Sequence, residues 1–244
     1  MPKSGPNQPE KALGKRLCDL RTKWGRTSLL YHSGMSVLGE KPIGLPPGAS
    51  NLAAGEDEAK YSSSNVLVRK LIDRLLRELR EAAGSTEGTW VDVGVGEGLA
   101  LEAIEARAGL LVGVEYRHDK LATALERLPA ARGIQADAGM LPLLDRSADI
   151  VTCLEVLEHL VAPERAVEEL ARISAGRCVV SVPSEPFFRL GNLCRGKDIG
   201  RWGNNPEHVQ HFRPSSLRRL LGRSFGDVSV TQCFPWLIAV ARPS

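Results

Sequence analysis

Short apolar runs alternate with segments of helical periodicity between residues 89 and 182. The runs have the length of buried strands, whereas the segments between them repeat apolar residues every three or four positions. Parallel strands need a helical crossover between them, so the alternation predicts an α/β domain with helices on both faces of a parallel sheet. The expected strands are Thr89–Val93, Leu110–Glu115, Gly133–Ala136, Asp149–Leu154 and Cys178–Val182.

Helices and a final hairpin complete the predicted domain. The expected helices are an apolar stripe over residues 67–83 that ends at Gly84, then Leu99–Ala108, Lys120–Leu128 and the segment that Pro163 opens. Near the end of the chain, Val228–Cys233 and Trp236–Ala241 have the pattern of strands. Only two residues separate them, which is too short for a crossover, so we expect this pair to be antiparallel.

Residues 1–60 are predicted to be a flexible basic tail and linker in front of a domain at residues 61–244. Residues 1–35 carry seven Lys or Arg and two Asp or Glu, a net charge of +5, which leaves −2 for the rest of a chain whose total is +3. Aromatic residues make up only 5% of the chain. A near-neutral domain with few aromatics argues against a dedicated nucleic-acid surface.

The five cysteines are odd in number and form no Cys-x-x-Cys pair, which indicates free thiols rather than a disulfide framework or a zinc site. No run of about 18 apolar residues is present to span a membrane. The N-terminus lacks the apolar segment of a signal peptide. We therefore expect a cytoplasmic protein.

Three glycines at a spacing of two, Gly94, Gly96 and Gly98, follow Asp92 at the end of the first predicted strand. Glycines let the backbone turn tightly and approach a ligand, because no Cβ stands in the way. The dinucleotide fingerprint differs, since its third glycine comes three residues after the second. An acid ahead of the first glycine suits a ligand with a cationic amine better than one with a pyrophosphate.

Two more carboxylates end the next two strands. Glu115 ends the second strand, where an acid can accept both ribose hydroxyls. Asp137 ends the third, where a short acid could accept from the exocyclic amine of a purine. Taken singly, Glu115 could be solvated surface and Asp137 a turn former. Together with Asp92, acids at the ends of three successive strands beside a glycine loop indicate one binding site.

On these residues the sequence resembles the class I S-adenosylmethionine-dependent methyltransferases, and among them the group with a type 11 methyltransferase domain, over roughly residues 61–242. The matching segments, in the family's order and spacing, are Val91–Gly98, Gly113–Glu115, Ala136–Leu143 and Ala148–His159. The resemblance implies S-adenosyl-L-methionine as the cofactor. It also implies a Rossmann-like seven-stranded sheet of order 3-2-1-4-5-7-6 with strand 7 antiparallel.

The resemblance further implies which residues bind the cofactor. These are Asp92, Gly94, Gly96 and Gly98 for the methionine part, Glu115 for the ribose with Tyr116 as a further contact, Asp137 and Ala138 for the adenine, and Leu154 and Glu155 beside the methionine end. No Asp-Asp or Asp-Asn pair follows the fourth or fifth strand, so a mechanism that depends on a divalent metal has no support.

Methyl transfer at a sulfonium carbon needs mainly alignment of the reactants, and a base helps where the acceptor is a hydroxyl. The candidate bases are His159, after the fourth strand, and His208 and His211, after the fifth. The last two belong to a segment of about residues 184–212 that the family uses as a lid over the acceptor. Each of the three could instead be a structural residue that fastens its loop.

We expect methyl transfer from S-adenosyl-L-methionine to a small-molecule acceptor, with O-methylation favoured. An Asn/Asp-Pro-Pro-Tyr/Phe motif, typical of enzymes that methylate amines of nucleobases or glutamine, is absent after the fourth strand. Two alternatives stay open. One is an RNA methyltransferase tethered by the basic tail, and the other is a cofactor-binding protein without catalysis.

Overall fold

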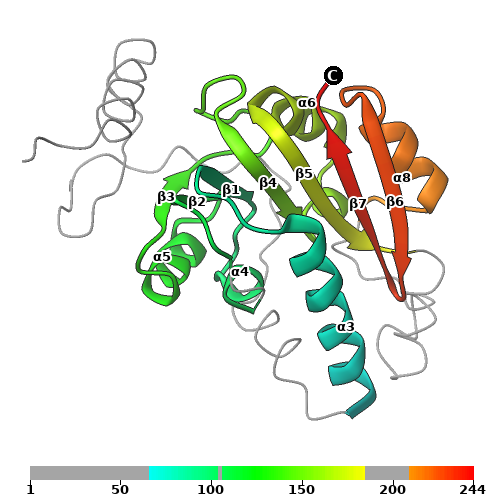
Figure 1. Cartoon of the computed structure of the whole chain (residues 1–244), viewed down its shortest axis with the longest axis horizontal. Helices are drawn as coiled ribbons and strands as arrows, with labels where there is room; N and C mark the ends of the chain where they lie inside the picture. Colours follow the sequence, from blue (N-terminus) through cyan, green and yellow to red (C-terminus); the bar gives the residue numbers. More distant parts are fainter. Residues whose placement is uncertain (1–65, 104–105, 185–208) are drawn as a thin grey trace, which may run out of the picture.

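The structure is a computed structural model that describes residues 66–103, 106–184 and 209–244. The predicted basic tail, His208 and most of the predicted lid lie outside these residues. The described residues include a seven-stranded sheet of order β3-β2-β1-β4-β5-β7-β6 (Figure 1). Its strands are β1 (Thr89–Val93), β2 (Leu110–Glu115), β3 (Arg132–Gln135), β4 (Ala148–Leu154), β5 (Ser174–Pro183), β6 (Asp227–Cys233) and β7 (Trp236–Arg242).

The predicted strand order and directions are confirmed. The pairs from β3 across to β5 are parallel, and β7 runs antiparallel to both β5 and β6. β5 begins at Ser174, earlier than the predicted Cys178, because Ser174 already pairs with Ala148 of β4. The parallel strands therefore end together at one edge of the sheet, which we call the carboxyl edge.

Helices cover both faces of the sheet, as predicted. The described helices are α3 (Val66–Ala83), α4 (Leu99–Ala103), α5 (His118–Arg127), the 3-10 turn η1 (Leu157–His159), α6 (Pro163–Ile173) and α8 (Pro214–Leu221). One buried apolar cluster joins α6 and α8 to one face, through side chains such as Leu170 and Leu217. A second joins α3, α4 and α5 to the other face, where Leu75 and Leu121 pack in the same cluster as Trp90.

The predicted helix over Leu99–Ala108 is too long. Helix α4 ends at Ala103, and residues 106–108 are not helical. Their backbone pairs instead with the loop before β1: the Thr86 N–H donates to the Arg107 carbonyl at 3.2 Å, and the Gly109 N–H donates to the Thr86 carbonyl at 3.2 Å. This pairing draws the chain into β2 and ends the helix early.

Helix α8 was absent from the prediction. Pro214 occupies the first turn, where its fixed φ suits a helix, and Leu217, Leu220 and Leu221 are buried. Among the described helices, none has the length and apolar character needed to cross a bilayer. Cys153, Cys178 and Cys233 are buried free thiols.

Candidate active site

The turn from β1 into α4 can be built only with glycine at its start. Gly94, Gly96 and Gly98 all have positive φ, of 81°, 56° and 80°. A Cβ at Gly94 would stand 2.3 Å from Cγ2 of Val156. The turn is fastened to β2, because the N–H groups of Gly94 and Val95 donate to the Val114 carbonyl at 2.8 and 3.0 Å. The three glycines add no Cβ of their own to the turn, so a ligand can approach its backbone closely at these positions.

The carboxylate of Glu115 lies against this glycine turn. Its Oε2 accepts the Gly96 N–H at 3.0 Å, and its Oε1 accepts the Arg117 N–H at 2.9 Å. The carbonyl of the neighbouring Tyr116 accepts from the Gln135 side chain, and the Tyr116 side chain is 40% exposed. Glu115, the residue predicted to bind the ribose, is thus held at the end of β2, one strand away from Asp92.

Asp92 is almost fully buried on β1, at 2% exposure. The hydroxyl of Thr152, on β4, donates to its Oδ1. Burial raises the pKa of Asp92 to about 7, the Thr152 hydrogen bond opposes that rise, and the charge of Glu115 adds to it. The sequence analysis missed Thr152. No signal in the sequence alone marks it, because its contact depends on the register between two strands.

Asp137 follows the end of β3 by two residues rather than ending the strand. It is exposed, and its Oδ1 accepts the Gly139 N–H at 2.7 Å, which shows the turn-forming role. The loop that begins with Asp137 and Ala138 is fastened to α6 by Arg172. The Arg172 guanidinium donates to the carbonyls of Leu141 and Leu143 at 2.9 and 2.7 Å, and this residue was also missed.

Leu154 ends β4 as a buried residue, and Glu155 follows it with a positive φ of 59°. The Glu155 carboxylate accepts the Ser181 hydroxyl at 3.2 Å and the Trp236 indole N–H at 2.9 Å. Ser181 is on β5 and Trp236 begins β7. The carboxylate therefore contacts the strands beyond β4, on the side away from β1 and its glycine turn.

His159 and His211 come close in the fold. His159 ends η1 and is half-buried, and its N–H donates to the Val156 carbonyl at 3.0 Å. The N–H groups of Val209 and Gln210 both donate to the carbonyl of Glu158, at 2.8 and 2.9 Å. His211 is exposed and directly follows Gln210. Both histidines therefore lie near the carboxyl end of β4, whereas His208 is outside the described residues.

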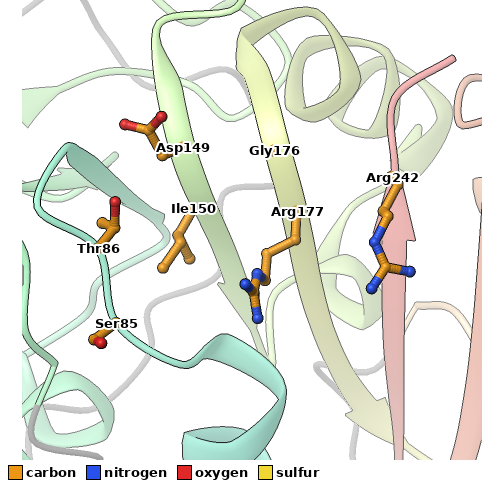
Figure 2. Close-up of a pocket in the computed structure, with 7 residues that line it drawn as sticks. All are labelled: Ser85, Thr86, Asp149, Ile150, Gly176, Arg177 and Arg242. Carbon is orange, nitrogen blue, oxygen red and sulfur yellow. The ribbon is translucent and has the colours of Figure 1, made fainter.

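A pocket of about 280 Å³ lies at the other edge of the sheet (Figure 2). Its lining includes Thr86 before β1, Asp149 early in β4, Arg177 early in β5 and Arg242 at the end of β7. Thr86, Asp149 and Arg177 lie at or near the amino ends of parallel strands, and Arg242 lies beside them because β7 runs antiparallel to β5. The pocket is therefore separate from the glycine turn, and we place the candidate site at the carboxyl edge on the chemistry of its side chains.

The residues at the carboxyl edge fit S-adenosylmethionine. Asp92 lies near the end of β1, Glu115 ends β2 against the glycine turn, and Asp137 follows β3. Residues 91–180 match the family model described as a methyltransferase domain. A probable S-adenosylmethionine-dependent methyltransferase of Mycobacterium tuberculosis is 32% identical over 145 residues, which are 59% of this chain and 50% of that protein. These matches support an assignment to the class I S-adenosylmethionine-dependent methyltransferases. The chain spans about half the length of the mycobacterial relatives it matches.

Other matches agree with this family. A ubiquinone biosynthesis O-methyltransferase of Idiomarina loihiensis is 36% identical to this chain over 141 residues, which are 53% of this chain and 58% of that relative. The solved structure of magnesium protoporphyrin IX methyltransferase from Synechocystis, with bound S-adenosylhomocysteine, superposes with a TM-score of 0.57 at 16% identity. That superposition covers 77% of this chain and 92% of the other, and it shows a shared fold.

Proposed function

We propose that the protein transfers the methyl group of S-adenosyl-L-methionine to a hydroxyl of a small-molecule acceptor. The observation that carries the proposal is the position of three carboxylates at the carboxyl edge: Asp92 on β1, Glu115 at the end of β2 against the glycine turn, and Asp137 two residues beyond β3. The Asp92 carboxylate suits the cofactor's ammonium group, and Glu115 suits the ribose hydroxyls. The cofactor supplies a methyl group that its sulfonium has already activated.

The acceptor side of the site lies over β4, β5 and β7. Glu155 is held there by Ser181 and Trp236, and His159 and His211 belong to the chain segments that follow β4 and β5. A neutral imidazole is well suited to take a hydroxyl proton near pH 7. We propose that one of these histidines, or His208, is the base, and that the rest of the site contributes alignment.

The names of the relatives support a small-molecule acceptor. They include ubiquinone biosynthesis O-methyltransferases and demethylmenaquinone methyltransferases, together with a phosphatidylethanolamine N-methyltransferase. We favour a hydroxyl on a quinone-like or other small intermediate. The buried thiols Cys153, Cys178 and Cys233 are consistent with the reducing cytoplasm that we propose as its location.

A screen with labelled cofactor tests this function. The purified protein is incubated with methyl-labelled S-adenosylmethionine and fractionated cell extract, and labelled products are identified by mass spectrometry. We expect an O-methylated small molecule. A labelled RNA would favour the RNA methyltransferase. Cofactor binding without a product from any fraction would favour a binding protein without catalysis.

Histidine variants then locate the base. His159→Ala, His211→Ala and His208→Ala are compared with His118→Ala, an exposed residue at the start of α5. Loss of a positioned base lowers turnover by about 10²–10⁴ while the Kd for the cofactor stays constant. If turnover survives in all three variants, the protein supplies alignment alone and the acceptor arrives already nucleophilic, as an amine or an enolate.

A further inference from the structure

Trp90, Thr152 and Asp92 form a buried chain of hydrogen bonds between β1 and β4. Asp92 and Thr152 are partners in the parallel register, and Trp90 lies two residues before Asp92 on the same strand. The Trp90 Nε1–H donates to Thr152 Oγ1 at 2.9 Å, and the Thr152 hydroxyl donates to Asp92 Oδ1. The three side chains are 1%, 0% and 2% exposed, so bulk water does not compete for these bonds.

The number of donor protons on each group fixes the direction of these hydrogen bonds. An indole N–H can only donate, an ionised carboxylate can only accept, and a hydroxyl has one proton to give. Thr152 Oγ1 receives the Trp90 proton, so its own proton is directed to Asp92. Without the indole, the hydroxyl could rotate to another acceptor, such as a backbone carbonyl. The Trp90 hydrogen bond thus orients the Thr152 hydroxyl so that it donates to Asp92.

We propose that Thr152, held in place by Trp90, is a positioning residue that keeps Asp92 ionised and oriented toward the cationic amine of the cofactor. This inference rests on the proposed function, because it requires the cofactor to bind beside the glycine turn. The second oxygen, Asp92 Oδ2, accepts no hydrogen bond from the residues that the structure describes. That oxygen is the one we assign to the amine.

The charges around Asp92 explain why it needs such help. Burial and the nearby carboxylate of Glu115, on β2, both raise the pKa of Asp92, whereas the Thr152 hydrogen bond lowers it. Cys153, on β4, also lies near Asp92, but burial raises the pKa of its thiol well above the ordinary value, so the thiol adds no charge beside Asp92 near neutral pH. Thr152 is the donor that opposes the protonation of Asp92.

The test is the pH dependence of cofactor binding by the full chain. The Kd for S-adenosylhomocysteine is measured by calorimetry between about pH 5.5 and 9 for the wild type, Thr152→Val and Thr152→Ser, a range that includes both expected midpoints. Affinity of the wild type should rise with pH as Asp92 ionises. Thr152→Val should weaken binding about tenfold at pH 7 and move the midpoint upward by about one pH unit. Thr152→Ser keeps the hydroxyl and should restore both values.

Two further variants separate the effect from a damaged core. Thr152→Val leaves the Trp90 N–H without an acceptor, so the double variant Trp90→Phe/Thr152→Val removes that donor too and should show the same midpoint shift. Val179→Ala is the matched control, because Val179 is the buried β5 partner of Thr152 and does not contribute a hydroxyl. It should keep the wild-type midpoint.

Three results would overturn the proposal. One is a Thr152→Val midpoint and Kd equal to those of the wild type. Another is a Val179→Ala shift as large as that of Thr152→Val, because the shift would then follow from lost packing. The third is a wild type that does not bind S-adenosylhomocysteine at any pH. That result would refute the proposed function itself, whereas the first two leave it intact.

Discussion

The carboxylate of Glu115 accepts the backbone N–H of Gly96 at 3.0 Å. One residue thus ends β2 and also holds the middle of the turn that follows β1. The second oxygen of Glu115 accepts the Arg117 N–H at 2.9 Å, which fixes the orientation of the carboxylate. Glu115, proposed to bind the ribose, and the glycine turn, proposed to bind the methionine part, are therefore connected to each other.

Replacing Glu115 should weaken cofactor binding through this connection. In Glu115→Ala the Gly96 N–H loses its acceptor and the ribose loses its carboxylate. A hydrogen bond to a charged group contributes about 1.5–3 kcal/mol, which corresponds to a rise in Kd of about 10- to 100-fold. Calorimetry with S-adenosylhomocysteine measures the change. Asp119→Ala, which removes an exposed carboxylate on α5, is the control and should bind normally. Equal affinities for both variants would contradict the assignment.

Gly94→Ala should destabilise the fold. The residue has a φ of 81°, and its Cβ would stand 2.3 Å from Val156 Cγ2. A left-handed conformation costs an alanine about 1–2 kcal/mol, and the contact with Val156 adds to this cost. Urea unfolding of the ligand-free protein should show a loss of at least about 2 kcal/mol. Adding Val156→Ala removes the contact but keeps the strained backbone, so it should recover only part of the loss. Full stability of Gly94→Ala would show that the turn is built differently.

Asp92→Asn should stabilise the ligand-free protein relative to the wild type, by an amount that grows as pH rises. The pKa of Asp92 is about 7 in the fold and 3.8 as its ordinary value, so ionisation is disfavoured by folding. The folded wild type holds the Asp92 proton more tightly than the unfolded chain does. The wild type is therefore most stable at low pH and loses this stability as pH rises toward 7. Between pH 5 and 8 the advantage of the variant should grow by up to about 2.7 kcal/mol, the equivalent of two pKa units. Denaturation at both pH values checks this, and a constant difference between the proteins would contradict it.

Arg172 should matter for the cofactor although we place it outside the site. It fastens the loop of Asp137 to α6 through Leu141 and Leu143, and it also bonds Glu169 at 2.6 Å. Arg172→Ala should raise the Kd for S-adenosylhomocysteine about tenfold by loosening that loop. Arg172→Lys should recover little, because an ammonium cannot reproduce the forked geometry of guanidinium. Arg223→Ala, which breaks an exposed 3.7 Å ion pair, should bind normally. Unchanged affinity in both Arg172 variants would show that the hydrogen bonds of Arg172 to this loop do not contribute to cofactor binding.

The strands and the glycine turn could be located because they depend on patterns within one segment, whereas the strand order followed from the resemblance to the family. Short apolar runs located the strands, and the glycine spacing located the turn. The end of α4 could not be predicted, since residues 106–108 leave the helix to pair with Thr86, which is distant in sequence. Helix α8 had a readable signal in Pro214 and the buried Leu217, Leu220 and Leu221, and it was overlooked.

Side-chain contacts within the site could not be predicted from the sequence either, because they also join segments that are distant in sequence. Thr152 reaches Asp92 only because β1 and β4 pair in one register. Glu155 was expected beside the methionine end, yet its carboxylate is held by Ser181 and Trp236 of the strands beyond β4. Such contacts depend on strand pairs that are some 25 to 80 residues apart, as the separations of 26, 60 and 81 residues show.

Thermal unfolding with S-adenosylhomocysteine tests the central claim most directly. A ligand that binds only the native state at a hundredfold excess over its Kd should stabilise the protein by about 2.7 kcal/mol. For a domain of this size that corresponds to a rise in Tm of about 5–10 °C. The double variant Asp92→Asn/Glu115→Ala should lose this rise. An unchanged Tm of the wild type with S-adenosylhomocysteine, or a rise with NAD in its place, would contradict a methyltransferase site at the glycine turn.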